Sequence, residues 1–295
     1  MDNIFKGIIP PVITAFDKNG YFDEHAQREI ISFLLPHVHG FYPTGTYGCG
    51  PLMTTEERKR VAEVIVDEVS GKVPVIIHIG SVNTAQVIEL AKHAESIGAD
   101  GVGAIPPYYY NYSQKNLLEY FRSILHATNL PVFAYNNPGL SNNPLEPETV
   151  AQLANEGLYG LKDSSFDLVD FYNFINAIKK PGFCFIIGTE AIAAAAVNAG
   201  AKGVISGLAN IWPELMQKLW LALVNGKTKN AAQLQLKVLE ARAVLKTAPT
   251  LVVCYEVLRM RGINPGNPRL PFHSLEKGKL KHIRSSFAEL GLHFT

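Results

Sequence analysis

The sequence predicts an α/β fold, a parallel (β/α)8 TIM barrel followed by a C-terminal appendage of three helices. Short runs rich in valine and isoleucine alternate with helical patterns at a period of roughly 25–30 residues. Eight strands that alternate with eight helices are typical of a closed parallel sheet. A near-repeat at 96–103 and 198–205 leads from a helix into a strand with the same glycine spacing. An open doubly wound sheet is the main alternative, but no GxGxxG follows the first strand.

Apolar runs bounded by turn residues define the predicted strands, and amphipathic runs define the helices. The helix at 55–69 has the clearest start, a capping box between Thr54 and Glu57. The strands are expected at 7–15, 40–42, 73–79, 101–105, 132–135, 160–162, 184–187 and 203–206. The helices between them are expected at 24–35, 55–69, 84–97, 114–127, 147–155, 168–178, 191–198 and 213–224.

The strand pattern stops near residue 226. Residues 229–246, 250–261 and 274–290 have helical patterns, with turn signals at 262–268. We therefore expect a barrel domain at 1–225 and an α-helical region at 226–295.

Composition excludes several classes of function. The net charge is +1 and no basic stripe is present, so nucleic acid is not an expected partner. No apolar run can span a bilayer, and the N-terminus lacks the layout of a signal peptide, which predicts a cytoplasmic protein without membrane contact. Cys49, Cys184 and Cys254 are widely spaced and are expected to be reduced thiols.

Lys162 is the most informative candidate for catalysis. It ends the apolar run 160–162 and is expected as the last inward residue of a buried strand. Burial disfavours an ammonium ion and lowers the pKa of a lysine. A neutral amine at a barrel mouth suits Schiff-base chemistry on a carbonyl substrate. The alternative is a lysine that leaves the strand end to pair with Asp163.

Further candidates follow other predicted strands, where barrel enzymes place their reactive groups. Tyr135, Tyr109 and Thr46 can move protons during imine formation and the aldol step. The amides of the glycine-rich turn at 45–48 can bind a carboxylate without adding charge. Packing remains an alternative role for each tyrosine, and an interface patch for the run 108–110. No group of histidine and acidic residues has metal-ligand spacing, so no metal is expected.

These motifs occur in a recognisable order: Gly45-Thr-Tyr-Gly48, Tyr109, Tyr135-Asn-Asn-Pro138 and Gly160-Leu-Lys-Asp163. As a set they resemble the dihydrodipicolinate synthase / N-acetylneuraminate lyase family, over residues 7 to about 225 and in the helical tail. The resemblance implies a lyase of the class I aldolase type that uses pyruvate and no cofactor. It also implies a homotetramer, with a dimer left open.

The resemblance assigns roles to individual residues. Lys162 matches the lysine that forms the pyruvate imine, and Tyr135 matches the proton-relay tyrosine. Thr46 matches the first hydroxyl of the family's turn, and Tyr109 matches the tyrosine of its Pro-Tyr-Tyr segment. Gly45 and the amides of Thr46 and Tyr47 would hold the pyruvate carboxylate. The remaining residues expected to bind substrate are Asn137, Leu140, Ser164, Gly188, Thr189, Glu190, Ile205 and Ser206.

Departures from the family pattern concern the substrate. Leu140 stands where the synthases carry an arginine for the aldehyde's carboxylate, so a charge-assisted contact is lost. Tyr47 and Cys49 replace the second hydroxyl residue and the glutamate of the turn. The segments 48–51 and 107–110 resemble 2-keto-3-deoxygluconate aldolases instead.

The expected function is reversible cleavage of a 2-keto-3-deoxy sugar acid to pyruvate and a small aldehyde. N-acetylneuraminate lyase, dihydrodipicolinate synthase and a keto-deoxy sugar-acid dehydratase are alternatives within the same chemistry. An inactive barrel that binds a metabolite is the alternative from another class.

Overall fold

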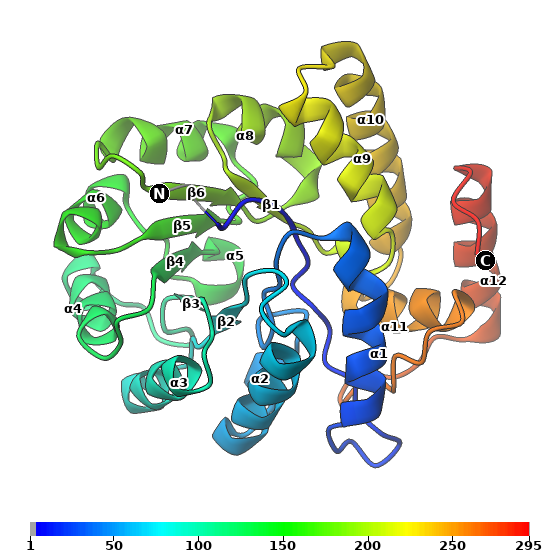
Figure 1. Cartoon of the computed structure of the whole chain (residues 1–295), viewed down its shortest axis with the longest axis horizontal. Helices are drawn as coiled ribbons and strands as arrows, with labels where there is room; N and C mark the ends of the chain where they lie inside the picture. Colours follow the sequence, from blue (N-terminus) through cyan, green and yellow to red (C-terminus); the bar gives the residue numbers. More distant parts are fainter. Residues whose placement is uncertain (1–3, 295) are drawn as a thin grey trace.

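A curled parallel sheet of seven strands forms the centre of the protein (Figure 1). The structure is a computed structural model that describes residues 4–294. The strands pair in the order β1-β7-β6-β5-β4-β3-β2, and every pair is parallel. They are β1 (Gly7–Ile9), β2 (Ile76–His78), β3 (Gly101–Ala104), β4 (Val132–Asn136), β5 (Gly160–Asp163), β6 (Cys184–Ile187) and β7 (Gly203–Ile205).

The predicted strand at 40–42 is the exception, because it forms a single bridge, from Phe41 to Val75, and no regular strand. Its backbone nevertheless reaches both edges of the sheet. The amide of Tyr42 donates to the carbonyl of Pro10 (3.0 Å), and the carbonyl of Phe41 accepts from the amide of Ile76 (2.9 Å). The sheet is therefore curled like a TIM barrel, with this segment between β1 and β2.

Prolines explain why the first strand is shorter than predicted. The sequence predicted a strand over 7–15, but β1 ends at Ile9. Pro10 and Pro11 follow directly, and proline has no N–H to donate to a sheet ladder. The chain beyond them is buried without strand pairing, and Pro11 lies on the wall of the candidate active site.

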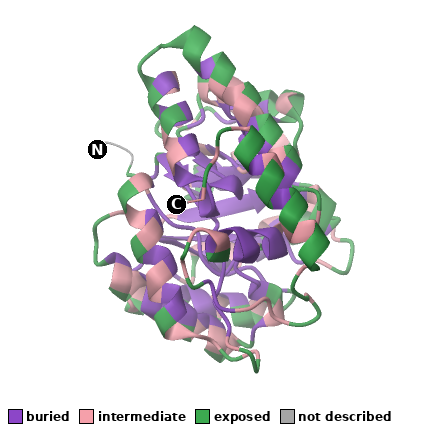
Figure 2. Cartoon of the chain, turned by 90° about the vertical axis from the view of Figure 1, so that its right-hand side faces the viewer, coloured by how far each residue is buried: buried purple, intermediate pink, exposed green. Residues whose placement is uncertain are grey.

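Helices cover the outside of the sheet, and their buried faces meet the apolar core (Figure 2). The capping box predicted at the start of α2 is confirmed, since Glu57 N donates to Thr54 Oγ1 (3.2 Å) and Thr54 N donates to Glu57 Oε2 (2.8 Å). The helices up to the end of the sheet are α1 (Glu24–Leu34), α2 (Thr55–Val69), α3 (Thr84–Ser96), α4 (Gln114–Leu125), α5 (Pro138–Ser141), α6 (Pro147–Glu156), α7 (Leu168–Ala177), α8 (Ala193–Ala199) and α9 (Pro213–Val224). Short 3-10 turns lie at Leu35–His37, Gly50–Leu52, Glu190–Ile192 and Leu208–Asn210.

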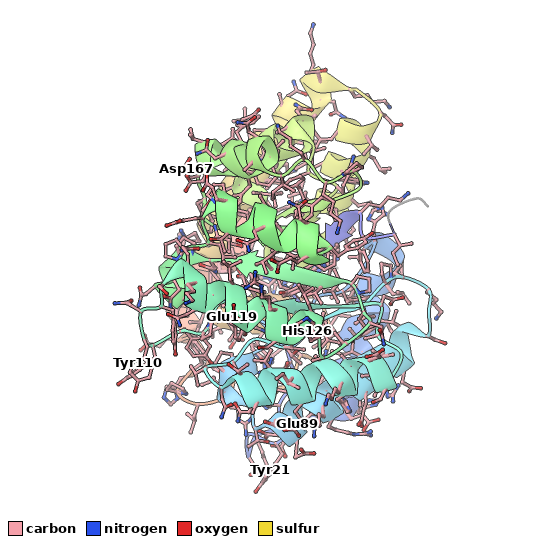
Figure 3. The ribbon with its side chains drawn as sticks, turned by 90° about the vertical axis from the view of Figure 1, so that its left-hand side faces the viewer. Tyr21, Glu89, Tyr110, Glu119, His126 and Asp167 are labelled. Carbon is pink, nitrogen blue, oxygen red and sulfur yellow. The ribbon has the colours of Figure 1, made fainter. Side chains whose placement is uncertain are left out.

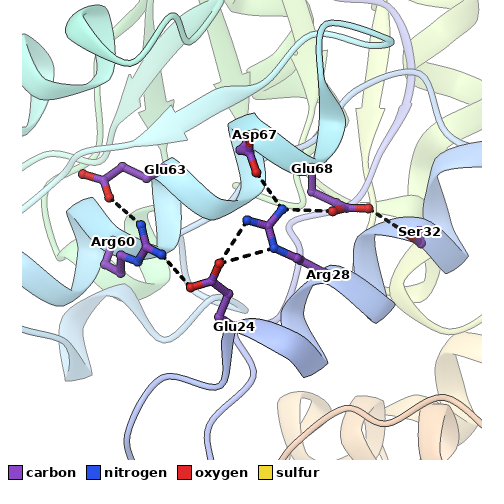
Figure 4. Close-up of polar contacts among 7 residues, drawn as sticks. All are labelled: Glu24, Arg28, Ser32, Arg60, Glu63, Asp67 and Glu68. Carbon is purple, nitrogen blue, oxygen red and sulfur yellow. Dashed lines mark hydrogen bonds and ion pairs between the residues drawn. The ribbon is translucent and has the colours of Figure 1, made fainter.

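Ion pairs connect the exposed faces of α1 and α2 (Figure 4). Arg28 contacts Glu24 (3.0 Å), Asp67 (2.7 Å) and Glu68 (3.0 Å), and Arg60 reaches Glu24 (2.6 Å). Exposed pairs contribute only about 0–1 kcal/mol each, so apolar packing carries most of this helix contact.

Three helices follow the sheet: α10 (Thr228–Leu245), α11 (Thr250–Met260) and α12 (Lys277–Glu289). α10 runs beside α9, and α12 lies at the opposite side of the molecule from α4 and α6 (Figure 1). α11 is buried almost throughout, and its Tyr255 hydroxyl donates to the carbonyl of Thr14. These three helices match the predicted ranges closely. The division into domains at 1–225 and 226–295 stays a prediction.

Within residues 4–294, none of the helices combines the length and the apolar character needed to cross a membrane.

Candidate active site

Lys162 and Tyr135 are neighbours across the β4–β5 pair, where they occupy the same register position. Side chains at matching positions of parallel strands point to the same face of a sheet. Both residues are only 4% exposed. The Nζ atom of Lys162 lies 3.5 Å from the centre of the Tyr135 ring and 4.2 Å from that of Tyr42. The amine therefore sits between aromatic faces.

The surroundings of Lys162 favour the neutral amine. Burial lowers the pKa of Lys162 below its usual 10.5, although Tyr135 offsets part of this effect. No carboxylate in the part of the chain that the structure describes lies within 4.0 Å of its amine. The alternative in which Lys162 pairs with Asp163 is wrong, because that carboxylate accepts from Asn136 Nδ2 (2.8 Å) and Ser165 Oγ (2.8 Å).

Hydrogen bonds surround the Tyr135 hydroxyl. Asn137 Nδ2 donates to it at 2.8 Å, and the side chains of Thr46 and Ser164 also hydrogen-bond to it. Burial would raise the pKa of Tyr135, but the Lys162 amine and these three hydrogen bonds bring it below 10.0. Thr46 is thus linked directly to Tyr135, and the phenol is well placed to exchange a proton.

A pocket of about 350 Å³ opens onto the Lys162 amine. Eleven of the fourteen predicted site residues line it, and together they come from the carboxyl ends of β4, β5, β6 and β7 and from the turn that follows residue 44. They are Thr46, Tyr47, Tyr135, Asn137, Leu140, Lys162, Ser164, Gly188, Thr189, Glu190 and Ile205.

The glycine-rich turn presents free amides to this pocket. No acceptor among residues 4–294 hydrogen-bonds to the amide of Thr46 or Tyr47. A Cβ at Gly48 would lie 2.7 Å from Thr44 N, and one at Gly50 would lie 2.0 Å from Thr44 O, so the turn requires glycine at both positions. Backbone amides arranged in this way can bind a carboxylate. Cys49 is buried in the turn, and burial raises the pKa of its thiol to about 12.

Three predicted site residues do not line the pocket. Tyr109 is 82% exposed and its ring packs at 5.0 Å on Tyr110, which projects from the edge of the molecule (Figure 3). The reason is local, because Tyr109 has φ +86°, which turns this loop outward. In the single chain Tyr109 therefore lies outside the pocket that contains Tyr135, and its role in proton transfer stays a prediction.

Gly45 and Ser206 have supporting positions instead. A Cβ at Gly45 would lie 3.2 Å from the Tyr42 ring, so this glycine lets the turn pack on the aromatic residue beside the lysine. Ser206 is fully buried, and its Oγ donates to Glu190 Oε2 at 2.8 Å. Ser206 was expected to contact the substrate, but its hydroxyl orients a carboxylate that faces the pocket.

Gly188 leaves room for the reactive lysine. A Cβ there would lie 2.0 Å from Ser164 Oγ and 3.1 Å from Lys162 Cε. Ser164 Oγ donates to the Gly188 carbonyl at 3.1 Å, which holds the β6 loop against β5. At Gly207, in the same way, a Cβ would lie 2.2 Å from the Tyr47 hydroxyl.

Part of the pocket wall comes from residues that were not predicted from the sequence. Arg242, Leu245 and Lys246 reach it from the end of α10, and Thr250 reaches it from the start of α11. Basic residues are common in the last turn of any helix, so Arg242 carried no signal of a site. Phe166 was also missed, because its left-handed backbone (φ +64°) cannot be read from the sequence. The further lining residues are Pro11, Gly139 and Gly207.

Candidate metal ligands do not gather in the described part of the chain, where no group of three or more His, Cys, Asp or Glu side chains could hold an ion. His78 lies beside this site, and its ring centre is 5.9 Å from that of Tyr135. Burial, helped by the charge of Arg58, holds the pKa of His78 well below 6.5, so its ring is neutral.

The curled parallel sheet, with a buried lysine and tyrosine at the ends of adjacent strands, places the protein among the TIM-barrel-like α/β proteins with a candidate active site at the carboxyl ends of the strands. Residues 4–289 match the Dihydrodipicolinate synthetase family, and the chain belongs to this family. Its members are class I pyruvate-dependent aldolases. The family and the lyase class predicted from the sequence are confirmed.

Relatives in this family have different activities. The chain is 36% identical over 288 residues to an uncharacterized DapA-like lyase of Halobacterium salinarum, which covers 97% of this chain and 94% of that protein. It is 38% identical over 245 residues to a probable 2-dehydro-3-deoxy-D-pentonate aldolase, YjhH, of Escherichia coli K12, with 81% of each chain covered. It is 34% identical over 289 residues to a 4-hydroxy-tetrahydrodipicolinate synthase of Bacillus subtilis, with 97% of this chain and 99% of that protein covered.

A solved structure supports the same assignment. The crystal structure of YagE, a prophage protein of E. coli K12 from the dihydrodipicolinic acid synthase family in complex with pyruvate, is similar with a TM-score of 0.94. The two sequences are 30% identical, and the match covers 98% of this chain and 100% of YagE.

Proposed function

We propose that the protein is a pyruvate-dependent aldolase that reversibly cleaves a 2-keto-3-deoxy sugar acid through an imine on Lys162. The observation that carries this proposal is a buried amine that has no carboxylate partner among residues 4–294 and is held against the phenol of Tyr135. Burial lowers the pKa of this amine and so favours its neutral, nucleophilic form, whereas an ordinary surface lysine is protonated at pH 7.

The chemistry needs only side chains and backbone of this pocket. The Lys162 amine attacks the C2 carbonyl to form a carbinolamine. Tyr135 gives its proton to the departing hydroxyl, so that loss of water leaves a protonated imine on Lys162 and a phenolate at Tyr135. Tyr135, as phenolate, takes the proton from the C4 hydroxyl while the C3–C4 bond breaks, which releases the aldehyde and sends the electron pair into the imine. The resulting enamine takes a proton at C3, and water then releases pyruvate. These reaction steps require no separate cofactor, because the imine on Lys162 is formed from the substrate itself.

Two groups of residues have supporting roles in this proposal. Thr46 and Asn137 hold the Tyr135 hydroxyl, and the amides of Thr46 and Tyr47 bind the carboxylate beside the reacting C2 carbon. Leu140 lines the pocket where an arginine was expected for a synthase. The apolar side chain favours a sugar-acid substrate over aspartate semialdehyde, and the name of the E. coli pentonate aldolase relative agrees with that choice.

Tyr109 connects the proposed function with an oligomer. This residue matches a relay tyrosine but is exposed in the single chain, together with Tyr110. A homotetramer, or a dimer, in which a second copy covers this aromatic pair would bring Tyr109 into a protected environment. We also propose that the protein acts in the cytoplasm, as predicted from the sequence.

Trapping of the imine tests the proposed function. Incubation with pyruvate and borohydride should give a reduced pyruvate adduct on the peptide that contains Lys162. Lys162→Met should abolish the adduct, and Lys202→Met, at an exposed lysine outside the pocket, should not. An unlabelled Lys162 peptide in the intact protein would exclude the aldolase and favour an inactive metabolite-binding barrel. Two further assays separate the remaining alternatives. Rapid condensation of pyruvate with aspartate semialdehyde would indicate a dihydrodipicolinate synthase. Cleavage of N-acetylneuraminate would indicate an N-acetylneuraminate lyase.

A further inference from the structure

The C-terminal helices form one wall of the candidate active site. Arg242 lies in the last turn of α10 and Lys246 directly follows that helix, and both line the pocket that contains Lys162. Neither residue belongs to the strand-end loops that supply the amine, the phenol and the carboxylate-binding amides. A charged wall built from a separate element suggests a separate task in substrate binding.

Arg242 is held in place by contacts on one side of its guanidinium group. Its Nε lies 3.0 Å from Glu190 Oε1, and the group stacks 5.3 Å from the centre of the Phe166 ring. The other Glu190 oxygen accepts from Ser206 Oγ at 2.8 Å. Gln235 Nε2, also from α10, donates to the Glu190 carbonyl at 2.9 Å. These contacts join α10 to the loops after β6 and β7.

These contacts leave the Nη side of the Arg242 guanidinium group free to bind a ligand. Nε is occupied by Glu190, but the two Nη nitrogens of Arg242 have no hydrogen-bond acceptor within residues 4–294. The Arg242 side chain keeps 19% of its surface exposed. Two parallel N–H groups on a planar guanidinium match the two oxygens of a carboxylate. Arg242 is therefore preorganised as a bidentate receptor.

The charges on this wall favour an anion. Arg242 and Lys246 provide two positive charges against the single negative charge of Glu190. Lys246 is exposed and forms no ion pair with any residue that the structure describes. Charge excess at the mouth of a concave site attracts ligands of opposite sign.

Phe166 adds an apolar surface beside the guanidinium group. It has φ +64°, an uncommon conformation for a bulky residue, and its side chain is 54% exposed. Backbone strain of this kind costs roughly 1–3 kcal/mol and is most often retained at functional sites. Here the aromatic ring lies against the guanidinium group of Arg242, 5.3 Å from its centre.

We infer that the α10 wall binds a carboxylate at the far end of the substrate, so that the preferred substrate is a keto-deoxy acid of the dicarboxylic, aldaric type. This inference rests on the proposed function and assigns its substrate class. In this arrangement the amides of Thr46 and Tyr47 bind the carboxylate next to the reacting carbonyl, and Arg242 binds the second carboxylate. Leu140 makes no charged contact with either end.

Matched substrates test the inference. Pyruvate release is measured with 2-keto-3-deoxy acids of equal chain length that end in a carboxylate, a hydroxymethyl group or a phosphate ester. The natural protein should prefer the carboxylate end over the hydroxymethyl end by about 10- to 100-fold in kcat/KM, the usual size of a contact with a charged group. Arg242→Gln should bring that ratio close to one, mainly through KM. Lys229→Gln, an exposed lysine at the other end of α10, should leave the ratio unchanged.

Further variants guard against misfolding. Arg242→Gln leaves the buried Glu190 without its ion pair, so the double variant Arg242→Gln/Glu190→Gln is measured beside it. Arg242→Lys, which keeps the charge but not the planar pair of donors, should retain part of the preference. A preference for the hydroxymethyl or the phosphate substrate, or an equal loss on all substrates in Arg242→Gln, would overturn the dicarboxylic assignment. Borohydride trapping of pyruvate on Lys162 is scored separately, and its failure in the natural protein would overturn the proposed function instead.

Discussion

The amine nitrogen of Lys162 lies 3.5 Å from the centre of the Tyr135 ring, which is its register partner on the adjacent strand. Tyr42 presents a second ring to the same nitrogen at 4.2 Å. Burial opposes a free ammonium here, but the faces of aromatic rings attract cations. The pocket therefore suits both a neutral amine before the reaction and a cationic imine during it.

Replacement of Tyr135 by phenylalanine tests the proton relay. The variant keeps the ring beside Lys162 but loses the hydroxyl that accepts from Asn137 at 2.8 Å. Turnover should fall by roughly 10²-fold, the usual contribution of a general acid or base. Steady-state release of pyruvate measures this loss, and Tyr21→Phe, at an exposed tyrosine, serves as the control. Turnover close to that of the natural protein would remove Tyr135 from the mechanism.

The pH dependence of imine formation reports the environment of Lys162. A lysine amine is nucleophilic only above its pKa, and burial lowers the pKa of Lys162 below 10.5. The rate of trapping with pyruvate and borohydride should therefore rise with pH and level off at a lower pH than for an exposed lysine. Tyr135 raises the pKa of Lys162, so Tyr135→Phe should move this rise to still lower pH. A midpoint at 10.5 or above in the natural protein would contradict the burial argument.

Substitution of Gly188 tests how closely the pocket is packed around the amine. The Cβ of Gly188→Ala would lie 2.0 Å from Ser164 Oγ and 3.1 Å from Lys162 Cε, so both side chains must move. We expect a loss of about 1–3 kcal/mol in the free energy of unfolding and at least a tenfold loss of activity. Denaturant unfolding and pyruvate release measure the two effects.

The control for this substitution is Gly278→Ala in α12, where an added Cβ meets no atom within 4 Å. That variant should be as stable as the natural protein or slightly more stable, because alanine favours a helix. Equal behaviour of the two alanine variants would show that Gly188 is not closely packed.

Much of the candidate active site could be predicted from the sequence, because its geometry depends on short-range rules. Apolar runs that end in a reactive residue placed Lys162 and Tyr135 at the carboxyl ends of neighbouring strands, and parallel pairing then brings such residues together. The tight turn at 45–50 could also be predicted from its glycines, since their small size is required by contacts within the turn itself. The strand predicted at 40–42 was not formed as a regular strand: Phe41 forms a single bridge, to Val75 on the β2 side of the sheet.

Folding in three dimensions decided which residues surround the substrate. Arg242 reaches the pocket because α10 packs beside α9 and against the 3-10 turn Glu190–Ile192, which no local pattern near residue 242 reveals. Ser206 and Tyr109 follow strands as predicted, but neither lines the pocket. The Ser206 hydroxyl donates to Glu190, and Tyr109 is exposed on the surface of its own chain. The position of Lys162 beside Tyr135 was thus determined by the sequence itself, through strand periodicity and register. The far wall of the pocket was decided by long-range packing, because contacts between distant segments exist only once the chain has folded.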